Sequence, residues 1–406
     1  MSAVPDDFVT GWVPHWRAGE GVRTIERAGS SMAEVSPFWF RALPDGRVGL
    51  IDSSSTGSLE NVVNAARQRQ MLILPSIVDG NGARVLATLL ADPAQRKAHV
   101  DHIVYLVEHG TGNGIEYDGI DIDYENFAFT DGRSTWPTTQ PVWISFVKEL
   151  GVALHSKGKL LSITVPPIWN AGERLDYWMY GPCDVQSYKL TSGGTATPAC
   201  AAAWADLMPY VDRWRLMVYD YNPSRATPQA PMYWLDEVIE YVKATVPSAE
   251  QDKVQLGVPA YGRSWATKAS AACTGDALRT VSVLSRDAPG LAAQYGATIV
   301  DATSLTGRPV VEKTFVYTRS YGVDGNATVQ PPKYEPPANR IDDVPGAADP
   351  APLQPATRLG ACIVERTVYF PDTASILARV NRIRDAGLGG AVIWALSFEP
   401  ADLWTA

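Results

Sequence analysis

The strongest constraint on the fold is a repeated alternation of short apolar runs with longer segments of helical periodicity. Eight runs rich in β-branched and aromatic residues occur, at 8–13, 35–40, 71–77, 117–123, 160–165, 214–219, 254–258 and 390–395. Helical patterns precede most of them, at 59–70, 93–108, 142–156, 201–210, 234–245 and 373–386. Apolar strands that alternate with helices form a parallel sheet covered on both sides. Eight such repeats predict an α/β chain closed into a (β/α)8 barrel.

The regular spacing fails once, between Trp265 and Tyr369, over an interval of roughly a hundred residues that is too long for a simple connection. Two β-rich runs lie within it, at 314–317 and 364–369, and a stretch rich in Pro, Ala and Asp covers 331–355. We therefore predict a small α+β insertion between the seventh strand and the last helix. The expected organisation is barrel over 1–265, insertion over 266–368 and barrel again over 369–406.

Several other classes of protein are disfavoured by composition. The net charge of -9 argues against a nucleic-acid or anionic-membrane partner, because both need exposed Lys and Arg. No apolar run approaches the ~20 residues that span a bilayer. The first residues lack the basic and apolar regions of a signal peptide, so we expect a signal peptide to be absent or removed. No G-x-G-x-x-G follows the first strand, which disfavours a dinucleotide-binding fold.

The segment 118–125, Asp-Gly-Ile-Asp-Ile-Asp-Tyr-Glu, carries the clearest sign of chemistry. Side chains alternate faces along a strand, so Asp121, Asp123 and Glu125 share one face and the residues between them share the other. Acids spaced ~7 Å apart on one face repel one another, and a purely structural strand has no reason to collect them. They also lie at the carboxyl end of a predicted barrel strand, where barrel enzymes place catalytic residues. We interpret this segment as an active-site strand.

The same segment resembles the D-x-x-D-x-D-x-E signature of glycoside hydrolase family 18, the chitinase family. Residues 216–222 resemble the M-x-Y-D motif of its sixth strand, and residues 257–263 resemble the G-x-P-x-Y-G-R motif of its seventh. Trp394 lies on the last strand, where this family places the tryptophan beneath the cleavage subsite. The insertion after the seventh strand matches as well, so the resemblance extends over nearly the whole chain.

Two positions depart from the pattern that is typical of chitinases. Residues 76–79 read Ser-Ile-Val-Asp where chitinases usually have S-x-G-G, and Tyr124 stands where they usually have Trp or Phe. Together with the runs 11–16 and 35–39, these departures make the chain more similar to a bacterial branch that resembles spore-germination and peptidoglycan-acting N-acetylglucosaminidases.

The resemblance implies retaining, substrate-assisted hydrolysis of N-acetylglucosaminides, in which the 2-acetamido oxygen attacks the anomeric carbon. Glu125 would protonate the leaving oxygen and then activate water. Asp123 would hold the acetamido N–H, and Asp121 would share a proton with Asp123. Tyr219 would donate a hydrogen bond to the acetamido oxygen.

The candidate substrate-binding residues are Asp220, Trp394, Met217, Tyr261, Arg263, Trp39 and Asp118. Trp394 would stack beneath the sugar and Asp220 would contact it, although Trp394 could also be a core residue and Arg263 a surface salt-bridge residue. Asp118 has the wrong parity for the acid face, so we expect it to support the site through a hydrogen bond. Trp169 and Trp265 are further candidates for outer sugar subsites.

No cofactor and no metal site are expected. His99 and His102 lie three residues apart on a predicted helix, but without acids at matching spacing we interpret them as part of a solvated helix face. The four cysteines lack metal-binding spacing, and we predict the disulfides Cys183–Cys200 and Cys273–Cys362, each bracketing a segment outside the barrel. Free buried thiols are the alternative. Disulfides would indicate a secreted or cell-envelope protein, with a cytoplasmic location left open.

The expected partner is a polysaccharide or oligosaccharide that contains N-acetylglucosamine, bound by a monomer. Two other functions stay open. One is a non-catalytic lectin or inhibitor on the same barrel, although such relatives typically lose the terminal Glu or the preceding Asp. The other is a barrel glycosidase that uses a second carboxylate as its nucleophile on a sugar without an acetamido group.

Overall fold

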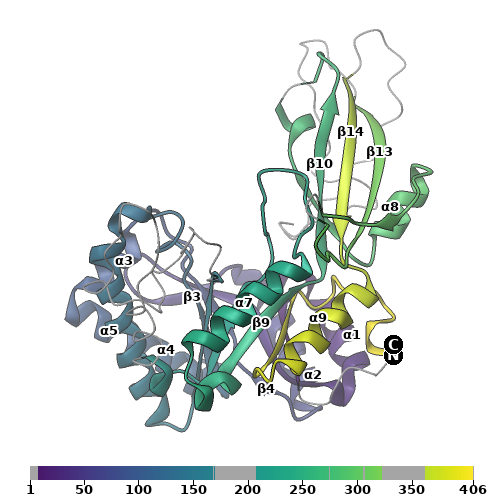
Figure 1. The fold of residues 1–406 in the computed structure, drawn as a ribbon. Helices are drawn as coiled ribbons and strands as arrows, with labels where there is room; N and C mark the ends of the chain where they lie inside the picture. The colour runs from purple at the N-terminus through teal and green to yellow at the C-terminus, as the bar shows by residue number, and fades with distance from the viewer. Residues whose placement is uncertain are drawn as a thin grey trace.

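The computed structural model describes residues 8–167, 169, 207–273, 275–304, 307–321 and 362–405. Its barrel strands are β1 (Val9–Pro14), β2 (Met32–Ala42), β5 (Ser76–Val78), β6 (Gly119–Asp123), β7 (Leu160–Val165), β8 (Arg213–Leu216), β9 (Val254–Pro259) and β15 (Gly390–Trp394). They pair in the order β1-β15-β9-β8-β7-β6-β5-β2, all parallel, and β2 pairs back to β1. The predicted (β/α)8 barrel is thereby confirmed (Figure 1).

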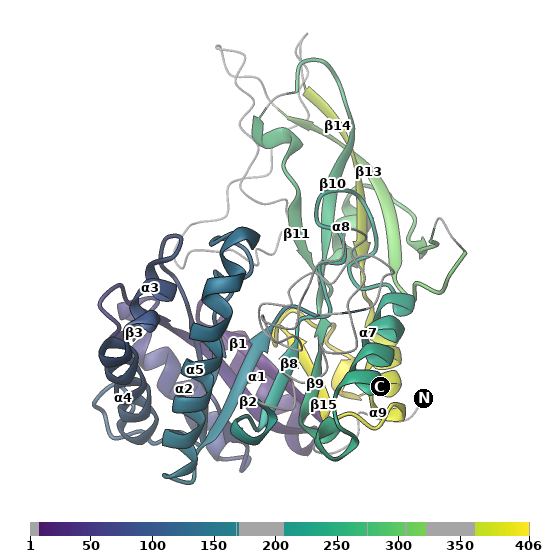
Figure 2. The ribbon, with the colours of Figure 1, turned by 60° about the vertical axis from the view of Figure 1, so that its left-hand side comes forward.

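Helices surround the ring of strands, as Figures 1 and 2 show from two directions. They are α1 (Ala18–Ala28), α2 (Thr56–Arg67), α3 (Val85–Ala91), α4 (Pro93–His109), α5 (Trp136–His155), α7 (Met232–Thr245) and α9 (Thr373–Asp385). Local sequence sets their starts: Asp92 caps α4 by accepting the N–H groups of Ala94 and Gln95, and Pro93 occupies the first turn. Two short strands, β3 (Val48–Leu50) and β4 (Leu72–Ile73), pair with β2. The helix expected at 201–210 falls mostly outside the described residues.

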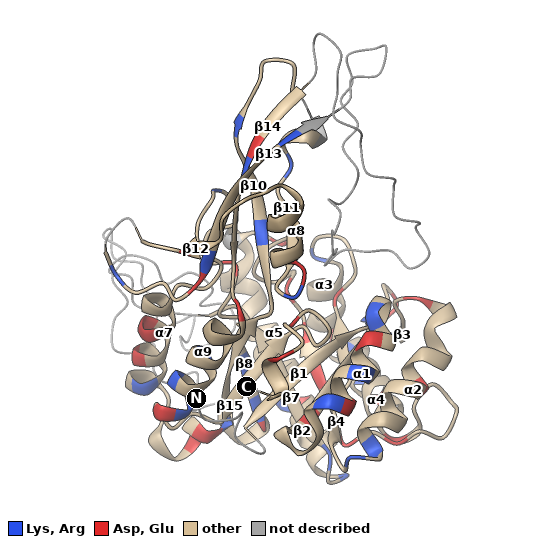
Figure 3. Cartoon of the chain, turned by 90° about the vertical axis from the view of Figure 1, so that its right-hand side faces the viewer, with Lys and Arg blue, Asp and Glu red and all other residues tan. Residues whose placement is uncertain are grey.

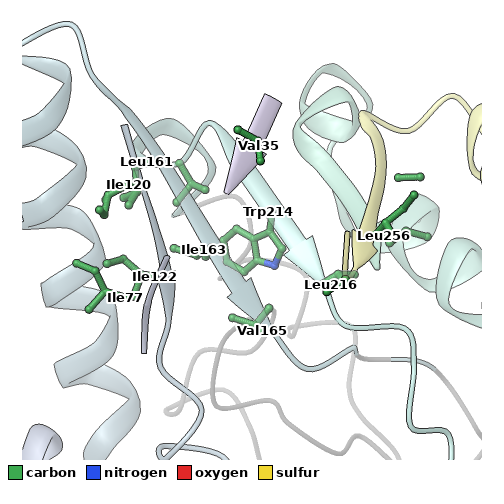
Figure 4. Packing of buried hydrophobic residues seen from close by; sticks show 14 of the residues in the cluster. Val35, Ile77, Ile120, Ile122, Leu161, Ile163, Val165, Trp214, Leu216 and Leu256 are labelled. Carbon is green, nitrogen blue, oxygen red and sulfur yellow. The ribbon is translucent and has the colours of Figure 1, made fainter. Parts of the chain in front are cut away.

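The two faces of the barrel strands carry different kinds of side chain. Residues such as Val35, Ile77, Ile120, Ile163 and Leu256 point outward and are fully buried in the main hydrophobic core. In Figure 4, Ile77 lies between its strand and a neighbouring helix. The alternate residues of these strands are also buried but polar; they include Glu34, Ser36, Ser76, Asp121, Ser162, Thr164, Arg215 and Gln255. The barrel interior is therefore a polar column, and the apolar core is the layer between strands and helices.

Arg215 ties this polar column together. Its Nη1 donates to Ser36 Oγ over 2.8 Å, its Nε donates to Gln255 Oε1 over 3.0 Å, and its Nη2 bonds Glu34. Arg215 is on β8 while Glu34 and Ser36 are on β2, which is not adjacent in the ring, so these bonds cross the interior. A buried guanidinium is tolerated because each of its nitrogen atoms has an acceptor.

The insertion is a five-stranded sheet between β9 and α9, and it rises from the barrel (Figure 1). Its elements are β10 (Tyr261–Ala269), β11 (Val281–Leu284), α8 (Ala288–Gln294), β12 (Val300–Asp301), β13 (Lys313–Tyr321) and β14 (Cys362–Phe370), paired in the order β11-β10-β14-β13-β12. The runs expected at 314–317 and 364–369 lie in β13 and β14. The sheet extends beyond the expected 266–368 at both ends. It begins at Tyr261, since a single residue, Ala260, separates β10 from barrel strand β9, and β14 continues to Phe370.

A buried ion pair joins the insertion to the barrel. Glu312, just before β13, accepts the backbone N–H of Gln229 at 2.8 Å and of Ala230 at 2.7 Å. Arg379 on α9 donates to the same carboxylate at 2.9 Å, and both charged side chains are at most 1% exposed. Three segments that are far apart in sequence therefore meet at one carboxylate.

A disulfide joins Cys273, which follows β10, to Cys362 at the start of β14, with 4.7 Å between the Cα atoms. This confirms one of the two predicted pairs. Cys183 and Cys200 lie outside the described residues.

The outer surface carries charges of both signs. Figure 3 shows blue and red segments interspersed on the helices around the barrel, for example on α1 and α7. Within the described ranges, no helix has both the length and the apolar character needed to cross a bilayer.

Candidate active site

A cleft of about 1300 Å³ opens where the barrel strands end. Side chains from β1, β2, β6, β7 and β15 line it, together with the residues that follow β8 and the start of β10. The cleft brings together nine residues that the sequence singled out: Asp123, Glu125, Trp169, Met217, Tyr219, Asp220, Tyr261, Arg263 and Trp394. This position agrees with the general rule that barrel enzymes build their sites at the carboxyl ends of the strands.

The acid strand β6 is positioned by a close approach to β7. A Cβ at Gly119 would lie 2.3 Å from the carbonyl oxygen of Leu160, so only glycine allows the two strands to pair at this register. On the other side, Ser76 of β5 pairs with Asp121 and Val78 with Asp123. Asp121 and Asp123 consequently point into the barrel, and Glu125 lies two residues beyond the strand in the cleft.

Asp121 is fully buried beneath the cleft and accepts hydrogen bonds from three other strands. Its Oδ2 accepts from Trp12 Nε1 at 2.9 Å and from Ser76 Oγ at 2.6 Å. Its Oδ1 accepts from the hydroxyl groups of Ser162 and Thr164, at 2.6 and 2.9 Å. The Arg215 guanidinium on β8 lies 3.4 Å from the same oxygen. The bonds around Asp121 hold it as an acceptor, and its sharing of a proton with Asp123 stays a prediction.

Asp123 differs from Asp121 in having unused hydrogen-bonding capacity. It lines the cleft but is only 7% exposed, and its Oδ1 has no hydrogen-bond partner among the described residues. Burial raises the pKa of its carboxyl well above the ordinary value, and the charges of Glu125, Asp121 and Asp79 raise it further. A buried polar atom without a partner at the wall of a cleft is suited to bind a ligand group.

Glu125 is available as a proton donor near neutral pH. Burial raises the pKa of its carboxyl to about 7, with further contributions from the negative charges of Asp79 and Asp220. A general acid works best when its pKa lies close to the working pH.

Tyr219 reaches the cleft across a glycine on the neighbouring strand. A Cβ at Gly257 would lie 2.8 Å from Tyr219 Cε1, so the absence of a side chain there makes room for the phenol ring. Burial, together with Tyr261 and Asp123, raises the pKa of Tyr219 well above its ordinary value. The phenol therefore keeps its proton and can donate a hydrogen bond into the cleft.

Asp220 is held in place by two neighbours. Arg263 Nε and Nη2 donate to its two carboxylate oxygens over 2.7 and 2.8 Å, and Gln229 Nε2 donates to Oδ1. Its backbone has a φ of 59°, a left-handed conformation that aspartate tolerates better than most residues. Arg263 thus lies in the cleft and pairs with a candidate site residue.

Trp394 and two other aromatic side chains form the floor of the cleft. Trp394 packs edge to face against Trp12, with ring centroids 5.7 Å apart, and against Phe38, at 5.0 Å. Trp169 also lines the cleft and packs edge to face on Trp234 at 5.3 Å. Such apolar faces are suited to stack against sugar rings.

Two predicted substrate contacts lie elsewhere. Trp39 is fully buried in the core and donates to the carbonyl oxygen of Ser55 at 3.3 Å. Its neighbour Phe38 has the parity of Glu34 and Ser36, which face the barrel interior, so Phe38 reaches the cleft instead. Asp118 precedes β6 at its opposite end, where it accepts the N–H of Ile73 at 2.8 Å and Arg67 Nη1 at 2.8 Å. It supports the strand through hydrogen bonds, as expected, but it is not a substrate contact.

The interpretation of His99 as part of a solvated helix face was wrong. His99 is fully buried, with Nδ1 2.6 Å from the carbonyl oxygen of Gly46 and Nε2 2.7 Å from the Tyr124 hydroxyl. Burial lowers its pKa to about 4, so the ring is neutral. Helix α4 turns this side toward the barrel, whereas His102 is exposed. The described residues contain no cluster of three or more His, Cys, Asp or Glu side chains arranged to hold a metal ion.

Several residues at the site were missed by sequence reasoning. Trp12 and Phe38 could have been found by extending the strand parity, since each alternates with core residues. Asp79 could have been found because it stands where the S-x-G-G pattern of chitinases has glycine. No feature of the sequence pointed to Phe129, which is 48% exposed at the cleft, or to Gln229. Trp265 does not line the described cleft; it is 5% exposed, with Nε1 3.5 Å from the carbonyl oxygen of Pro223.

Comparison with known proteins identifies the family. The model of glycosyl hydrolases family 18 matches residues 31–399. A chitinase from Chromobacterium violaceum ATCC 12472 superposes with a TM-score of 0.66 at 18% identity, and the match covers 100% of this chain and 97% of the chitinase chain. The spore cortex-lytic enzyme SleL of Bacillus megaterium QM B1551 gives 0.64 at 15% identity, covering 100% and 73%. A family 18 chitinase of Cycas revoluta, solved with (GlcNAc)3, gives 0.61 at 16% identity, covering 98% and 97%. The chain therefore belongs to glycosyl hydrolase family 18 and is a glycoside hydrolase.

Proposed function

We propose that this enzyme hydrolyses β-linked N-acetylglucosaminides with retention, using the 2-acetamido group of the substrate as the nucleophile. The observation that carries the proposal is the arrangement of Asp123, Glu125 and Tyr219 in one cleft above Trp394. Glu125 holds a proton near neutral pH, Asp123 has an unused acceptor oxygen, and Tyr219 is a protonated donor. These are the groups that an acetamido sugar needs at the cleavage subsite.

The reaction has two steps. In the first, the acetamido oxygen bonds to the anomeric carbon while the glycosidic bond breaks, and the leaving oxygen takes the proton of Glu125. Asp123 accepts the acetamido N–H and Tyr219 donates to the acetamido oxygen, which keeps the group in line for attack. In the second step, water attacks the anomeric carbon of the oxazolinium ion while the bond from that carbon to the acetamido oxygen breaks. A proton of the water passes to the Glu125 carboxylate, the acetamido group is restored, and the configuration is retained.

The surroundings of the other acids favour this route over an enzyme nucleophile. The described lining of the cleft includes two further carboxylates, Asp220 and Glu237. Asp220 is paired with Arg263, and Glu237 Oε1 lies 2.6 Å from Arg308 Nη1. A carboxylate committed to a guanidinium is a poor nucleophile, because attack would cost the ion pair.

The remaining assignments extend this proposal. The presence of both Asp123 and Glu125 favours an enzyme over a lectin or inhibitor on the same barrel. Chitin oligosaccharides and peptidoglycan glycans are the two substrates that we propose to compare, since the similar structures include chitinases and a spore cortex-lytic enzyme.

The Cys273–Cys362 disulfide supports secretion or a cell-envelope location, because disulfides persist in oxidising compartments. We propose that the enzyme acts as a monomer.

The test is side-by-side digestion of chitooligosaccharides and peptidoglycan, with mass analysis of the products. We expect hydrolysis by the wild type and a loss of at least ~10²-fold in Glu125→Gln, the lower end of what general acid catalysis supplies. Binding without cleavage would favour a lectin, and near-normal rates in Glu125→Gln would remove Glu125 as the donor.

A second experiment tests the nucleophile. A thiazoline analogue of the oxazolinium ion should inhibit, since enzymes bind species that resemble the transition state most tightly. A substrate with a free 2-amine at the cleaved sugar has no carbonyl oxygen to attack and should not be hydrolysed. Cleavage of that substrate at the normal rate, or products of inverted configuration, would require an enzyme nucleophile or base.

A further inference from the structure

Asp79 is a buried carboxylate beside the cleft that takes no part in the chemistry proposed for Glu125. It directly follows β5, and because Val78 pairs with Asp123, it lies alongside the chain that leads from β6 to Glu125. Only 7% of Asp79 is exposed, and it is not among the residues that line the cleft. A carboxyl group buried this far is costly unless other groups compensate for the lost water.

The compensating contacts join Asp79 to the residue after Glu125. Asp79 Oδ2 accepts the backbone N–H of Asn126 over 2.5 Å. The Asn126 side chain donates in return to the carbonyl oxygens of Asp79, at 3.1 Å, and of Asn81, at 2.9 Å. These bonds bind the end of β5 to the turn that begins at Glu125, and so restrict the direction in which Glu125 can point.

Charge connects Asp79 to Glu125 as well. After burial, the negative charge of Asp79 is the largest influence that raises the pKa of Glu125, ahead of Asp220. Asp79 also raises the pKa of Asp123, although burial and the charges of Glu125 and Asp121 have larger effects on it.

Few other ionisable groups act on Asp79. Asp131 faces it from the loop after β6, where it accepts the backbone N–H of Arg84. Tyr124 also senses its charge, and the Tyr124 hydroxyl is bonded to the neutral His99. Of the described residues, none that shifts the pKa of Asp79 is a cation.

We propose that Asp79 is a positioning residue for Glu125, which fixes the turn that carries the proton donor and places a negative charge beside it. The inference rests on the proposed function of Glu125 as the donor. Chitinases usually have glycine at this position of the S-x-G-G pattern, so a carboxylate there distinguishes this chain from them. Asp79 acts through Glu125 and does not touch the substrate.

The charge has a defined consequence for pH dependence. Burial raises the pKa of Asp79 to about 6, while that of Glu125 is about 7. Between these values Asp79 is ionised and Glu125 still holds its proton. A nearby negative charge disfavours ionisation of Glu125, so removing that charge lowers the pKa of Glu125. The donor then loses its proton at a lower pH, and activity falls earlier as the pH rises.

The test is the pH profile of kcat/KM for Asp79→Asn on a chitooligosaccharide. Asparagine keeps a side-chain oxygen for the Asn126 N–H but removes the charge. We expect the basic limb to move to lower pH by at least about half a unit, a modest part of what a close charge can supply. Asp131→Asn is the matched control, because Asp131 is buried nearby but is not among the charges that act on Glu125. Its basic limb should not move.

A purely structural role for Asp79 predicts a different result, in which kcat falls and the basic limb stays where it is. That result, or an unchanged profile with unchanged activity, overturns the proposal. If Asp79→Asn does not fold, Asp79→Ser supplies a shorter neutral acceptor and is measured in the same way.

A readout that needs no hydrolysis separates this inference from the proposed function. The carboxyl ¹³C resonance of Glu125, identified by its loss in Glu125→Gln, should titrate at lower pH in Asp79→Asn than in wild type. A shift in an enzyme that hydrolyses neither glycan supports the coupling between Asp79 and Glu125 and rejects the proposed function. An active enzyme in which the titration of Glu125 does not shift supports the proposed function and overturns the inference.

Discussion

Asp121, Asp123 and Glu125 are identical in chemical type, and their surroundings give them different properties. Asp121 accepts from donors on β1, β5 and β7, whereas Asp123 keeps one oxygen without a partner among the described residues. Glu125, beyond the end of the strand, titrates close to neutral pH because it is buried near other acids. Separating like groups by environment is a general way in which enzymes obtain acid, base and binding roles from carboxylates.

At the residue scale, Gly257→Ala tests whether the position of Tyr219 matters. The added methyl group would lie 2.8 Å from Tyr219 Cε1 and 3.0 Å from the carbonyl oxygen of Leu216, so the ring must move. We expect kcat/KM to fall by roughly 10-fold or more, since small displacements of aligned groups are expensive. Steady-state kinetics with circular dichroism would measure this. The matched control is Gly57→Ala, whose new methyl group meets nothing within 4 Å, and equal kinetics for the two variants would refute the expectation.

At the element scale, the insertion contributes directly to the site through the first residues of β10. Tyr261 and Arg263 lie in the cleft, and Arg263 holds Asp220. Gln229 holds Asp220 from the other side, and its own backbone is bonded to Glu312. The first strand of the insertion, the loop after β8 and helix α9 therefore act together on one carboxylate of the cleft.

The Glu312 contacts give a second prediction. Glu312→Gln leaves the buried Arg379 without its ion-pair partner, a change that costs about 3–5 kcal/mol when one member of a buried pair is lost. We expect the Tm to fall by several degrees and KM to rise as Gln229 loosens its hold on Asp220. Thermal denaturation and kinetics would show both effects. Lys268→Met removes an exposed ion pair with Glu365 instead and should change stability by less than about 0.5 kcal/mol.

At the scale of the whole molecule, the described part of the chain leaves the barrel after β9 and returns at α9. The Cys273–Cys362 disulfide closes a loop of the inserted sheet across a sequence separation of 89 residues. The bond joins the end of β10 to the start of β14, far along the chain from the acid strand. Neither cysteine lines the cleft, so this bond can be removed without changing a residue of the candidate site.

This arrangement predicts the effect of removing the bond. Replacement of Cys273 and Cys362 by Ser should lower the free energy of unfolding by about 2–5 kcal/mol, the usual cost of losing a native disulfide. Hydrolysis of short oligosaccharides at 25 °C should persist, because Asp123, Glu125 and Tyr219 come from the barrel. Denaturant unfolding of oxidised, reduced and doubly substituted protein measures the effect. An unchanged midpoint in all three would contradict it.

Much of the fold and of the acid strand was predictable because both depend on local periodicity. Eight runs of apolar residues alternating with helices led to a closed barrel, and period-two alternation placed Asp121, Asp123 and Glu125 on one face. At β2 the same alternation places Phe38, not Trp39, on the face of Glu34 and Ser36, so it predicts Phe38 as the residue that reaches the cleft. His99 was misassigned because helical periodicity gives the faces of α4 but not which one turns toward Tyr124 and the barrel.

The sequence by itself determined the order of the elements, the placement of the acids at a strand end and the resemblance to the family, because strand parity and motif spacing are properties of the local chain. Only the tertiary structure decided what surrounds each group. The Arg215 bonds across the barrel, the Gly257 space for Tyr219, the Glu312 contact and the approach of Asp79 to Asn126 all join segments distant in sequence. Burial and neighbouring charge act through space, so the proton affinity of Glu125 could be assigned only once the strands were closed into a ring.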